Sequence, residues 1–184
     1  MSLKHKLIAY LKGFYPAFVN FIINLPPDDS FSNSYVRPYI ARLFGLNCGK
    51  KCKIKKHIYI QYHKHIFIGD NSFIFGQSHI DALAQVTIGN NVRIAPQVLI
   101  VTGTHERGAP EKRAGETFGE PIVIGDGCWI GARVTITSGV TIGEGCIVSA
   151  GSVVMRSMPP HSLIAGNPAR PIQKLDAPQD AKVT

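Results

Sequence analysis

The residue with the clearest chemical potential is His105, in the stretch Val101-Thr-Gly-Thr-His-Glu106. A neutral imidazole has a pKa near 6.5, so at cellular pH it is mostly unprotonated yet able to take a proton from a hydroxyl group. His105 stands at the root of a segment, roughly residues 102–121, that contains Gly, Pro and alternating charges. Long loops on a rigid scaffold tend to carry function. The six other histidines do not share this context, so His105 is the first candidate for a general base.

The four cysteines give little sign of a metal site. Cys48 and Cys52 are separated by three residues, and no second pair with metal-binding spacing accompanies them. This pattern is weak evidence for zinc and favours a reducing compartment, so we expect a cytoplasmic protein without a metal.

A six-residue repeat from Ile122 to Ser157 is the element that must position His105. Written in rows of six, it is IVIGDG-CWIGAR-VTITSG-VTIGEG-CIVSAG-SVVMRS, and the third position of every row is an aliphatic residue. Strands alternate with period 2 and helices with period 3.6, so a strict period of six indicates a parallel β-helix. Stacked coils would turn the inward residues into ladders, each gaining about 1.5–3 kcal/mol from burial. We interpret the small or polar fourth column as allowing the backbone to turn each corner.

The same spacing extends toward the N-terminus with interruptions. Two-residue slips are predicted between residues 60 and 68 and between residues 80 and 88. Ile100 and Ile124 are 24 residues apart, so one step of six leaves an 18-residue excursion. The expected organisation is an N-terminal helical extension and cap at 1–47, a β-helix at 48–157 with a protruding loop at 102–121, and a C-terminal closing segment and tail at 158–184.

Residues 3–25 are predicted to be helical, with an apolar face at three- and four-residue steps. Lys12 and Asn20 interrupt this face, and Pro16 breaks or kinks the run. Our first interpretation is packing against the side of the β-helix or against a neighbouring subunit, and the second is a peripheral membrane anchor. A second short helix is predicted from Tyr35 to Phe44, where it would cap the open end of the repeat.

Positive charge is concentrated ahead of the regular repeats. Residues 1–67 carry 11 Lys and Arg against 2 Asp and Glu, a net charge of +9, and residues 68–184 carry 9 against 10, a net charge of −1. The basic run at residues 50–56 is suited to phosphate, an anionic membrane surface or an acidic glycan, or it is only a solvated edge that discourages strand pairing. No feature matches a nucleic-acid module, so nucleic acid is not an expected partner.

On these motifs the chain resembles the left-handed β-helix hexapeptide-repeat acyltransferases. The resemblance is to the sugar and polysaccharide O-acetyltransferases related to the galactoside, maltose and nodulation-factor enzymes, and the Arg42-Leu-Phe-Gly-Leu-x-x-Gly49 run resembles capsule and colanic-acid acetyltransferases. In that family three hexads close one triangular coil, which implies an all-β, left-handed parallel β-helix and a homotrimer. Cys128 and Cys146, which are 18 residues apart, would then stack as two small buried hydrophobic residues.

The resemblance implies an acetyl-CoA-dependent O-acetyltransferase that modifies a carbohydrate hydroxyl. His105 matches the catalytic histidine of the family, which implies a general base and direct transfer without an acyl-enzyme. Asp81 and Glu116 are the implied acceptor residues, although Asp81 is also suited to stabilising a turn, and Phe75 stands where galactoside enzymes have a sugar-contacting asparagine. The residues that match the coenzyme A groove between adjacent prisms are Trp129, Ala132, Ala150, Met155, Arg156, Arg170 and Lys174. Lys174 is included because the second arginine of the family is Gln173 here, and the neighbouring lysine can replace its charge.

Three other functions stay open. A streptogramin-type acetyltransferase would acetylate an antibiotic instead of a sugar, and the pocket residues do not exclude it. A β-helix of the γ-carbonic-anhydrase kind needs three histidine ligands for zinc, and the His-x4-His pair that those proteins carry after the loop is absent. An inactive scaffold is disfavoured by the intact His105 segment.

Overall fold

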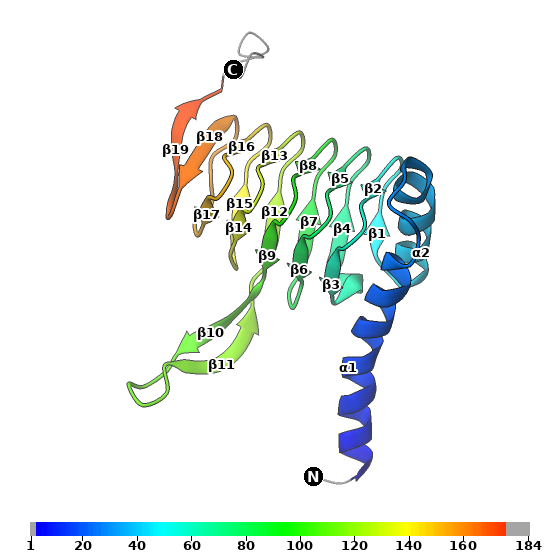
Figure 1. The fold of residues 1–184 in the computed structure, drawn as a ribbon. Helices are drawn as coiled ribbons and strands as arrows, with labels where there is room; N and C mark the ends of the chain where they lie inside the picture. The colour runs from blue at the N-terminus through cyan, green and yellow to red at the C-terminus, as the bar shows by residue number, and fades with distance from the viewer. Residues whose placement is uncertain (1–2, 176–184) are drawn as a thin grey trace.

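Short parallel strands, joined by tight corners, wind around the three sides of a prism (Figure 1). The structure is a computed structural model that describes residues 3–175, with side chains from residue 14 onward. Sheet A contains β1 (Asn47–Cys48), β4 (Ile66–Ile68), β7 (Val86–Ile88), β12 (Ile122–Ile124) and β15 (Thr141–Ile142). Sheet B contains β2 (Lys53–Ile54), β5 (Phe73–Ile74), β8 (Arg93–Ile94), β13 (Trp129–Ile130), β16 (Ile147–Val148), β18 (Ser162–Gly166) and β19 (Ala169–Lys174). Sheet C contains β3 (Tyr59–Gln61), β6 (His79–Asp81), β9 (Leu99–Val101), β14 (Thr135–Ile136) and β17 (Val153–Val154). The predicted parallel β-solenoid is confirmed.

The register of the sheets gives the length of each coil. Cys48 pairs with Ile68, and Ile68 pairs with Ile88, so the first coils contain 20 residues. Ile124 pairs with Ile142, so the later coil contains 18. The extra residues of the early coils lie at the corners 62–65 and 82–85, which confirms the two predicted slips.

The core is the ladder of third-column residues, and the glycines beside it have a different role from the expected one. The third-column side chains of all six rows, from Ile124 to Val154, are at most 1% exposed. Fourth-column Gly125 and Gly131 do not turn the corner, because the positive φ angles lie in the sixth column instead, for example at Gly127 (+69°) and Arg133 (+59°). A Cβ on Gly131 would lie 2.6 Å from the backbone nitrogen of Ala150. The fourth column is therefore small because consecutive coils approach closely there.

The N-terminal extension covers the open end of the prism. The helix α1 (Leu3–Asn24) leads through a linker and a π-helical turn, η1 (Ser32–Val36), into α2 (Arg37–Leu43), which contacts β1 and β2. The buried guanidinium of Arg37 donates to the carbonyl oxygens of Pro26 and Pro27 and so holds the linker against the cap. The expected second helix is confirmed with a shorter α-helical part, because its first turn is π-helical.

The apolar face predicted for α1 does not pack against the side of its own prism. Phe18, Phe21 and Leu25 are exposed, and the buried residues are Val19, Asn20 and Ile23. Asn20, which interrupts the apolar pattern, is an anchor: its amide nitrogen donates to the carbonyl oxygen of Ile60 at 2.7 Å, and its Oδ1 accepts the Ile60 N–H at 2.8 Å. The side chain thereby satisfies the free edge of β3. None of the helices in the described part of the chain is long and apolar enough to cross a membrane.

Residues 102–121 leave the prism at the edge where sheets C and A meet, the CA edge (corners 62–65, 82–85, 138–139 and 155–157). The segment is not an irregular loop, because β10 (Gly103–Arg107) and β11 (Ala114–Gly119) pair as an antiparallel hairpin that projects away from the prism (Figure 1). The C-terminal segment also forms a hairpin, in which β19 returns along β18 and closes the end of sheet B.

Candidate active site

His105 lies on β10, where its imidazole is held by the opposite strand of the hairpin. Its Nδ1 is 3.2 Å from the carbonyl oxygen of Gly115 and 3.3 Å from Oγ1 of Thr117. A carbonyl oxygen can only accept, so Nδ1 carries the proton and donates it to Gly115. The lone pair of the neutral ring is then on Nε2, which makes no hydrogen bond within the described residues. An exposed ring with a fixed tautomer and a free Nε2 is arranged to accept a proton.

A β-bulge places the orienting carbonyl. His105 is paired with Thr117, but Arg107 is paired with Ala114, so β11 has one more residue than β10 between these pairs. Bulges bend a strand and re-aim its groups, which here brings the Gly115 carbonyl to the His105 ring. A Cβ on Gly115 would lie 2.9 Å from the carbonyl oxygen of Glu106, so a larger residue would shift the bulge.

The base of the hairpin is anchored to the coil beneath it through Thr102, which is fully buried. The Thr102 N–H donates to the carbonyl oxygen of Asp81 at 3.0 Å, and Oγ1 of Thr102 donates to the same oxygen at 3.1 Å. The same Oγ1 accepts the N–H of Ala84 at 2.9 Å. The returning strand is held by the Glu120 N–H, which donates to the Thr102 carbonyl oxygen at 3.0 Å. These bonds fix the position from which His105 is presented.

The two predicted acceptor residues lie on either side of this base. Asp81 ends β6 directly beside Val101, the last residue of β9, so its backbone supports the hairpin as expected of a structural aspartate. Its Oδ1 is buried and has no hydrogen-bond partner in the described part of the protein, so one carboxylate oxygen at this point is left unsatisfied. Glu116 is exposed on β11 between the two residues that contact His105, and its side chain makes no hydrogen bond or ion pair among residues 14–175.

The sequence motif gave no indication of several groups at the site. Gly115, Thr117 and Thr102 orient or support His105 through the hairpin pairing, which periodicity does not reveal. Arg107 and Arg113 share a recess with His105 and Glu106, and they bring positive charge beside the ring. A glycine inside a strand, as in Ala114-Gly115-Glu116, is the one signal in the sequence that indicates a bulge.

Three of the predicted donor residues lie together at the edge where sheets B and C meet, the BC edge (corners 75–78, 95–98, 131–134 and 149–152). Ala132 and Ala150 stack on consecutive coils, because the N–H of Gly151 donates to the Ala132 carbonyl oxygen at 2.8 Å. The turn between β18 and β19 lies on the next level, where the Gly166 N–H donates to Oγ of Ser152 at 3.2 Å. Arg170 follows this turn. Two small residues therefore lead to one guanidinium, a surface that fits an extended chain ending in phosphate.

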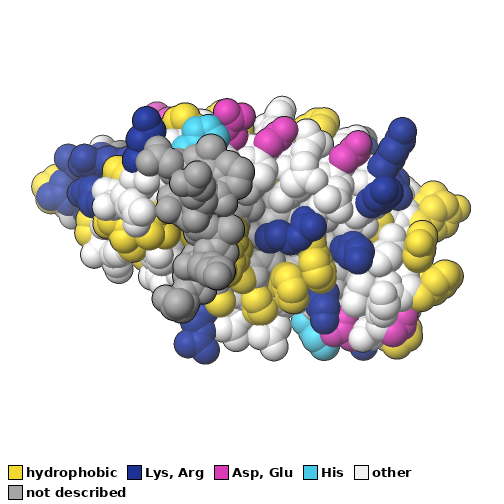
Figure 2. All heavy atoms as spheres, turned by 90° about the horizontal axis from the view of Figure 1, so that it is seen from above, with side chains coloured by type: hydrophobic (Ala, Val, Ile, Leu, Met, Phe, Trp, Pro, Cys, Tyr) yellow, Lys and Arg dark blue, Asp and Glu magenta, His cyan; other side chains and the backbone are white. Residues whose placement is uncertain are grey.

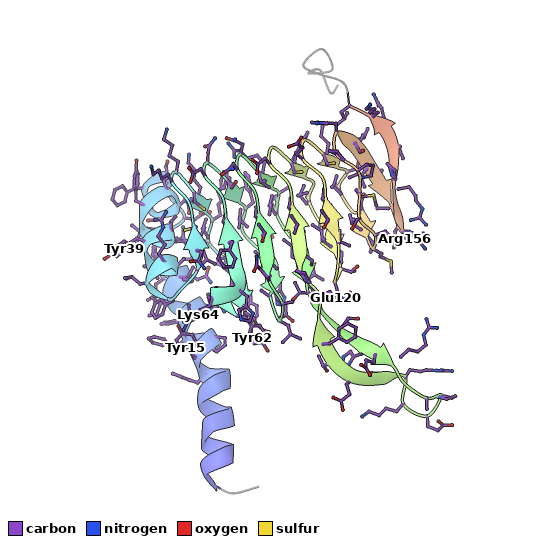
Figure 3. All side chains as sticks on the ribbon, turned by 180° about the vertical axis from the view of Figure 1, so that it is seen from behind. Tyr15, Tyr39, Tyr62, Lys64, Glu120 and Arg156 are labelled. Carbon is purple, nitrogen blue, oxygen red and sulfur yellow. The ribbon has the colours of Figure 1, made fainter. Side chains whose placement is uncertain are left out.

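The remaining donor residues are distributed over other parts of the prism. Trp129 lies on the outer face of sheet B and is half exposed, between Arg93 and Ile147 in register. Met155 and Arg156 follow β17 at the CA edge, the edge from which the hairpin projects, and Figure 3 shows Arg156 and Glu120 along it. Lys174 is at the opposite end of β19 from Arg170, about 13 Å away at the usual strand rise. Lys174 is thus not adjacent to Arg170 in the same chain.

His105 and the Ala132–Ala150 surface belong to different edges of one prism. The strands of sheet C run from the BC edge to the CA edge, so one six-residue side, up to about 20 Å, separates the two groups. A single chain does not bring its own base and its own donor surface together.

The cysteines do not form a ligand set. Cys128 and Cys146 are buried and free, and their thiols donate to the carbonyl oxygens of Gly143 and Pro159. The neighbouring Cys146 thiol, together with burial, raises the pKa of Cys128, so that this thiol stays protonated. Within residues 3–175 no three His, Cys, Asp or Glu side chains converge as a metal site would require.

Comparison with known proteins bears directly on the repeat. The family model described as "Bacterial transferase hexapeptide (six repeats)" matches residues 121–156. The galactoside O-acetyltransferase of Escherichia coli (strain K12) is 36% identical over 129 residues, which cover 70% of this chain and 63% of that protein.

Two solved structures extend the likeness over nearly the whole chain. A maltose O-acetyltransferase from Clostridium difficile 630 is 32% identical with a TM-score of 0.81, and the match covers 90% of this chain and 89% of that one. The hexapeptide-repeat acetyltransferase VCA0836 from Vibrio cholerae O1 biovar eltor, solved with acetyl coenzyme A, is 32% identical with a TM-score of 0.80, covering 91% and 88% of the two chains. With the repeat, the solenoid and these relatives in agreement, the chain belongs to the hexapeptide-repeat acetyltransferase family.

Proposed function

We propose that the protein is an acetyl-CoA-dependent O-acetyltransferase that modifies a hydroxyl group of a sugar, with His105 as the general base. The observation that carries the proposal is the hydrogen bond from Nδ1 of His105 to the Gly115 carbonyl oxygen, which leaves Nε2 as the basic nitrogen. The relatives support the reaction class, because a maltose and a galactoside O-acetyltransferase are among them and VCA0836 is solved with acetyl coenzyme A.

In the proposed step, Nε2 of His105 takes the proton of the acceptor hydroxyl as its oxygen attacks the thioester carbonyl carbon. The carbon–sulfur bond then breaks, and the protonated imidazole returns its proton to the leaving thiolate. The new ester and free coenzyme A balance the reaction without an acyl-enzyme. Gly115 stabilises the imidazolium in between, because its carbonyl oxygen accepts from Nδ1 in both ring states.

The donor is proposed to lie along the BC edge, with its pantetheine arm over Ala132 and Ala150 and its phosphates near Arg170. Small side chains are suited to this edge because they leave room for a chain to lie close to the backbone. Trp129, Met155, Arg156 and Lys174 remain predicted donor contacts. Asp81 and Glu116 remain the predicted acceptor contacts, and the unpaired Oδ1 of Asp81 supports the first of them.

The proposal includes a homotrimer, because His105 and the donor surface lie on different edges of one prism. A cyclic arrangement brings the CA edge of one copy against the BC edge of the next, and the groove between them then contains both groups. Peripheral association with a membrane through the basic N-terminal region is also part of the proposal, in keeping with the net charge of +9 over residues 1–67.

Release of free thiol from acetyl-CoA, measured against a panel of oligosaccharides and antibiotics, tests the proposal and identifies the acceptor. His105→Ala should lower kcat by about 10²–10⁴ with unchanged folding, because a general base contributes that much. The matched control is His161→Ala, which removes an exposed histidine at another corner of the prism and should leave the rate as it is. An undiminished rate in His105→Ala would end the assignment.

A further inference from the structure

The outward side of α1 is the most unusual surface of the molecule. Phe21 is 62% exposed and Leu25 is 56% exposed, and Phe18 is exposed on the same side. At 100° per residue these three positions fall within one narrow stripe, on the opposite side of the helix from the buried Ile23. A helix that is apolar on both sides normally lies in a protein interior or at a membrane. Phe18 packs edge-on against Phe44 of the cap, so Phe21 and Leu25 are the residues of this outward stripe that call for a partner.

The hydrogen bonds of α1 show which way this stripe faces. Asn20 and Asn24 bond to backbone groups of Ile60 and Ile58, in and beside β3. These bonds hold the C-terminal turns of α1 against β3, the edge strand of sheet C, while the rest of the helix projects beyond the prism on the same side as the hairpin (Figure 1). At 100° per residue Phe21 and Leu25 lie about 60–140° around the helix from these asparagines, so their side chains are turned away from β3 without lying directly opposite it.

The cap continues the same surface. Phe31, Tyr35 and Tyr39 are exposed on the linker, η1 and α2. Figure 3 shows Tyr39 pointing outward at the capped end, and Figure 2 shows hydrophobic side chains forming that end of the molecule with Lys and Arg side chains beside them. We call the surface formed by Phe18, Phe21, Leu25, Phe31, Tyr35 and Tyr39 the end face.

The charge around the end face distinguishes between the possible partners. Tyr35 and Tyr39 line a recess together with Arg42, Lys51 and Lys53. Two copies that met end to end would bring two such basic regions, each with a net charge of +9 over residues 1–67, against each other. An anionic lipid surface instead complements both features, because aromatic rings enter the interface and lysines meet the headgroups.

We propose that the end face binds an anionic membrane surface, and that the acceptor is accordingly a sugar attached to a lipid. The second part rests on the proposed acetyltransferase function. In sheet C, β3, β6 and β9 are consecutive, so the root of the His105 hairpin is two strand spacings, about 10 Å, from the edge strand that α1 covers. A saccharide headgroup that projects from a bilayer can reach this height. In a trimer with parallel prisms, three end faces would meet the same plane and reinforce one another.

Flotation of the full-length protein with phosphatidylglycerol vesicles tests the binding. We expect the protein to float with these vesicles, less so at high salt, and to remain behind with phosphatidylcholine vesicles. Phe21→Asp should lower the binding by about tenfold or more, since it removes an exposed aromatic ring that would enter the lipid interface and adds a negative charge that anionic lipids repel. The matched control is Ile172→Asp, at a site that is 61% exposed on β19, and it should float like the unchanged protein.

Three outcomes would overturn the proposal: no flotation of the unchanged protein, equal flotation of Phe21→Asp, or equal binding to both lipids. A fourth contradicting outcome would come from sedimentation velocity without lipid. End-to-end pairs of trimers that Phe21→Asp separates would show that the stripe binds a second copy of the protein and not a membrane.

Turnover is measured in parallel with the best acceptor of the panel, both free and attached to a lipid anchor in vesicles. Phe21→Asp should act normally on the free acceptor and about tenfold more slowly on the anchored one. Failure with the free acceptor by the unchanged protein would count against the acetyltransferase proposal and not against lipid binding.

Discussion

At His105 the orienting partner is a backbone carbonyl oxygen and not a carboxylate. A carbonyl fixes the tautomer without adding a charge beside the ring. A backbone carbonyl is present whatever side chain the residue carries, so this hydrogen bond depends on the bulge at Gly115 that brings the carbonyl to the ring. The orientation of the base is therefore encoded in backbone geometry.

This is why the sequence predicted the base but not its support. His105 could be recognised because an unusual residue type stands where the repeat is interrupted. Gly115 and Thr117 meet it only through antiparallel pairing, in a segment whose exposed residues show no buried face from which a register could be read. Asp81 was predicted to bind the acceptor or stabilise a turn, and the structure shows its backbone carbonyl supporting the hairpin while one carboxylate oxygen has no protein partner.

His63, at the first corner of the CA edge, gives a prediction about stability and pH. Burial lowers its pKa to about 4, and its Nε2 has no partner in the described part of the protein. In the unfolded chain the pKa returns to about 6.5, so below that pH the unfolded state binds a proton that the folded state refuses. Above pH 6.5 the titration of His63 should therefore not change the free energy of unfolding. As the pH falls from 6.5 toward 4, the free energy of unfolding should decrease progressively.

Chemical unfolding at pH 7.5 and pH 5 measures this effect against a His63→Leu variant, which cannot titrate. Between the two pH values, the folded-to-unfolded ratio of the unchanged protein should fall about tenfold or more beyond that of the variant. Parallel losses in the two proteins would show that His63 is not the group responsible.

At the scale of the elements, the hexad predicted the coil because each row places one aliphatic residue inside, and all of these residues are buried. The two slips could also be predicted, since inserted residues leave the inward positions countable on either side. The repeat did not reveal which physical requirement selects a small residue at each corner position. Gly125 and Gly127 look equivalent in the sequence, yet the first is required by the neighbouring coil and the second by its φ of +69°.

The helical extension was the least predictable element. Its length was anticipated within a residue or two, but its orientation was not, because α1 is apolar on two sides and periodicity alone cannot choose between them. The choice is made by Asn20 and Asn24, whose amides match the open hydrogen-bonding edge of β3. A polar residue in an apolar face was thus the informative feature.

The ladder of inward residues predicts the outcome of two neighbouring substitutions on β15. Ile142 is fully buried and pairs with Ile124, so Ile142→Asp would place a charge without a partner in the core. The cost of several kcal/mol is comparable with the whole stability of a typical domain, about 5–15 kcal/mol, so the variant should be unfolded or insoluble. Thr141→Asp, one residue earlier on an exposed face, should fold normally. Circular dichroism and soluble yield distinguish the two, and a folded Ile142→Asp protein would contradict the ladder.

For the molecule as a whole, the site is divided between two edges of the prism, so one chain alone cannot form a complete site. His105 is presented at the CA edge, whereas Ala132, Ala150 and the turn before Arg170 line the BC edge. Within residues 3–175, neither edge is closed by another element that would complete the site. Catalysis then depends on assembly, and the end faces of an assembly with parallel prisms point the same way.

This dependence predicts that two inactive variants restore each other. His105→Ala lacks the base, and Ala150→Trp fills the donor surface, so each should be inactive when expressed alone. In co-expressed trimers, an intact site forms wherever the His105 of an Ala150→Trp copy faces the donor surface of a His105→Ala copy. With equal and random mixing, about a quarter of the interfaces satisfy this condition, so about a quarter of the normal turnover should return. Mixing the purified variants without subunit exchange is the control and should restore nothing. If both groups served a site within one chain, every site would keep one defect, and the co-expressed protein would stay inactive.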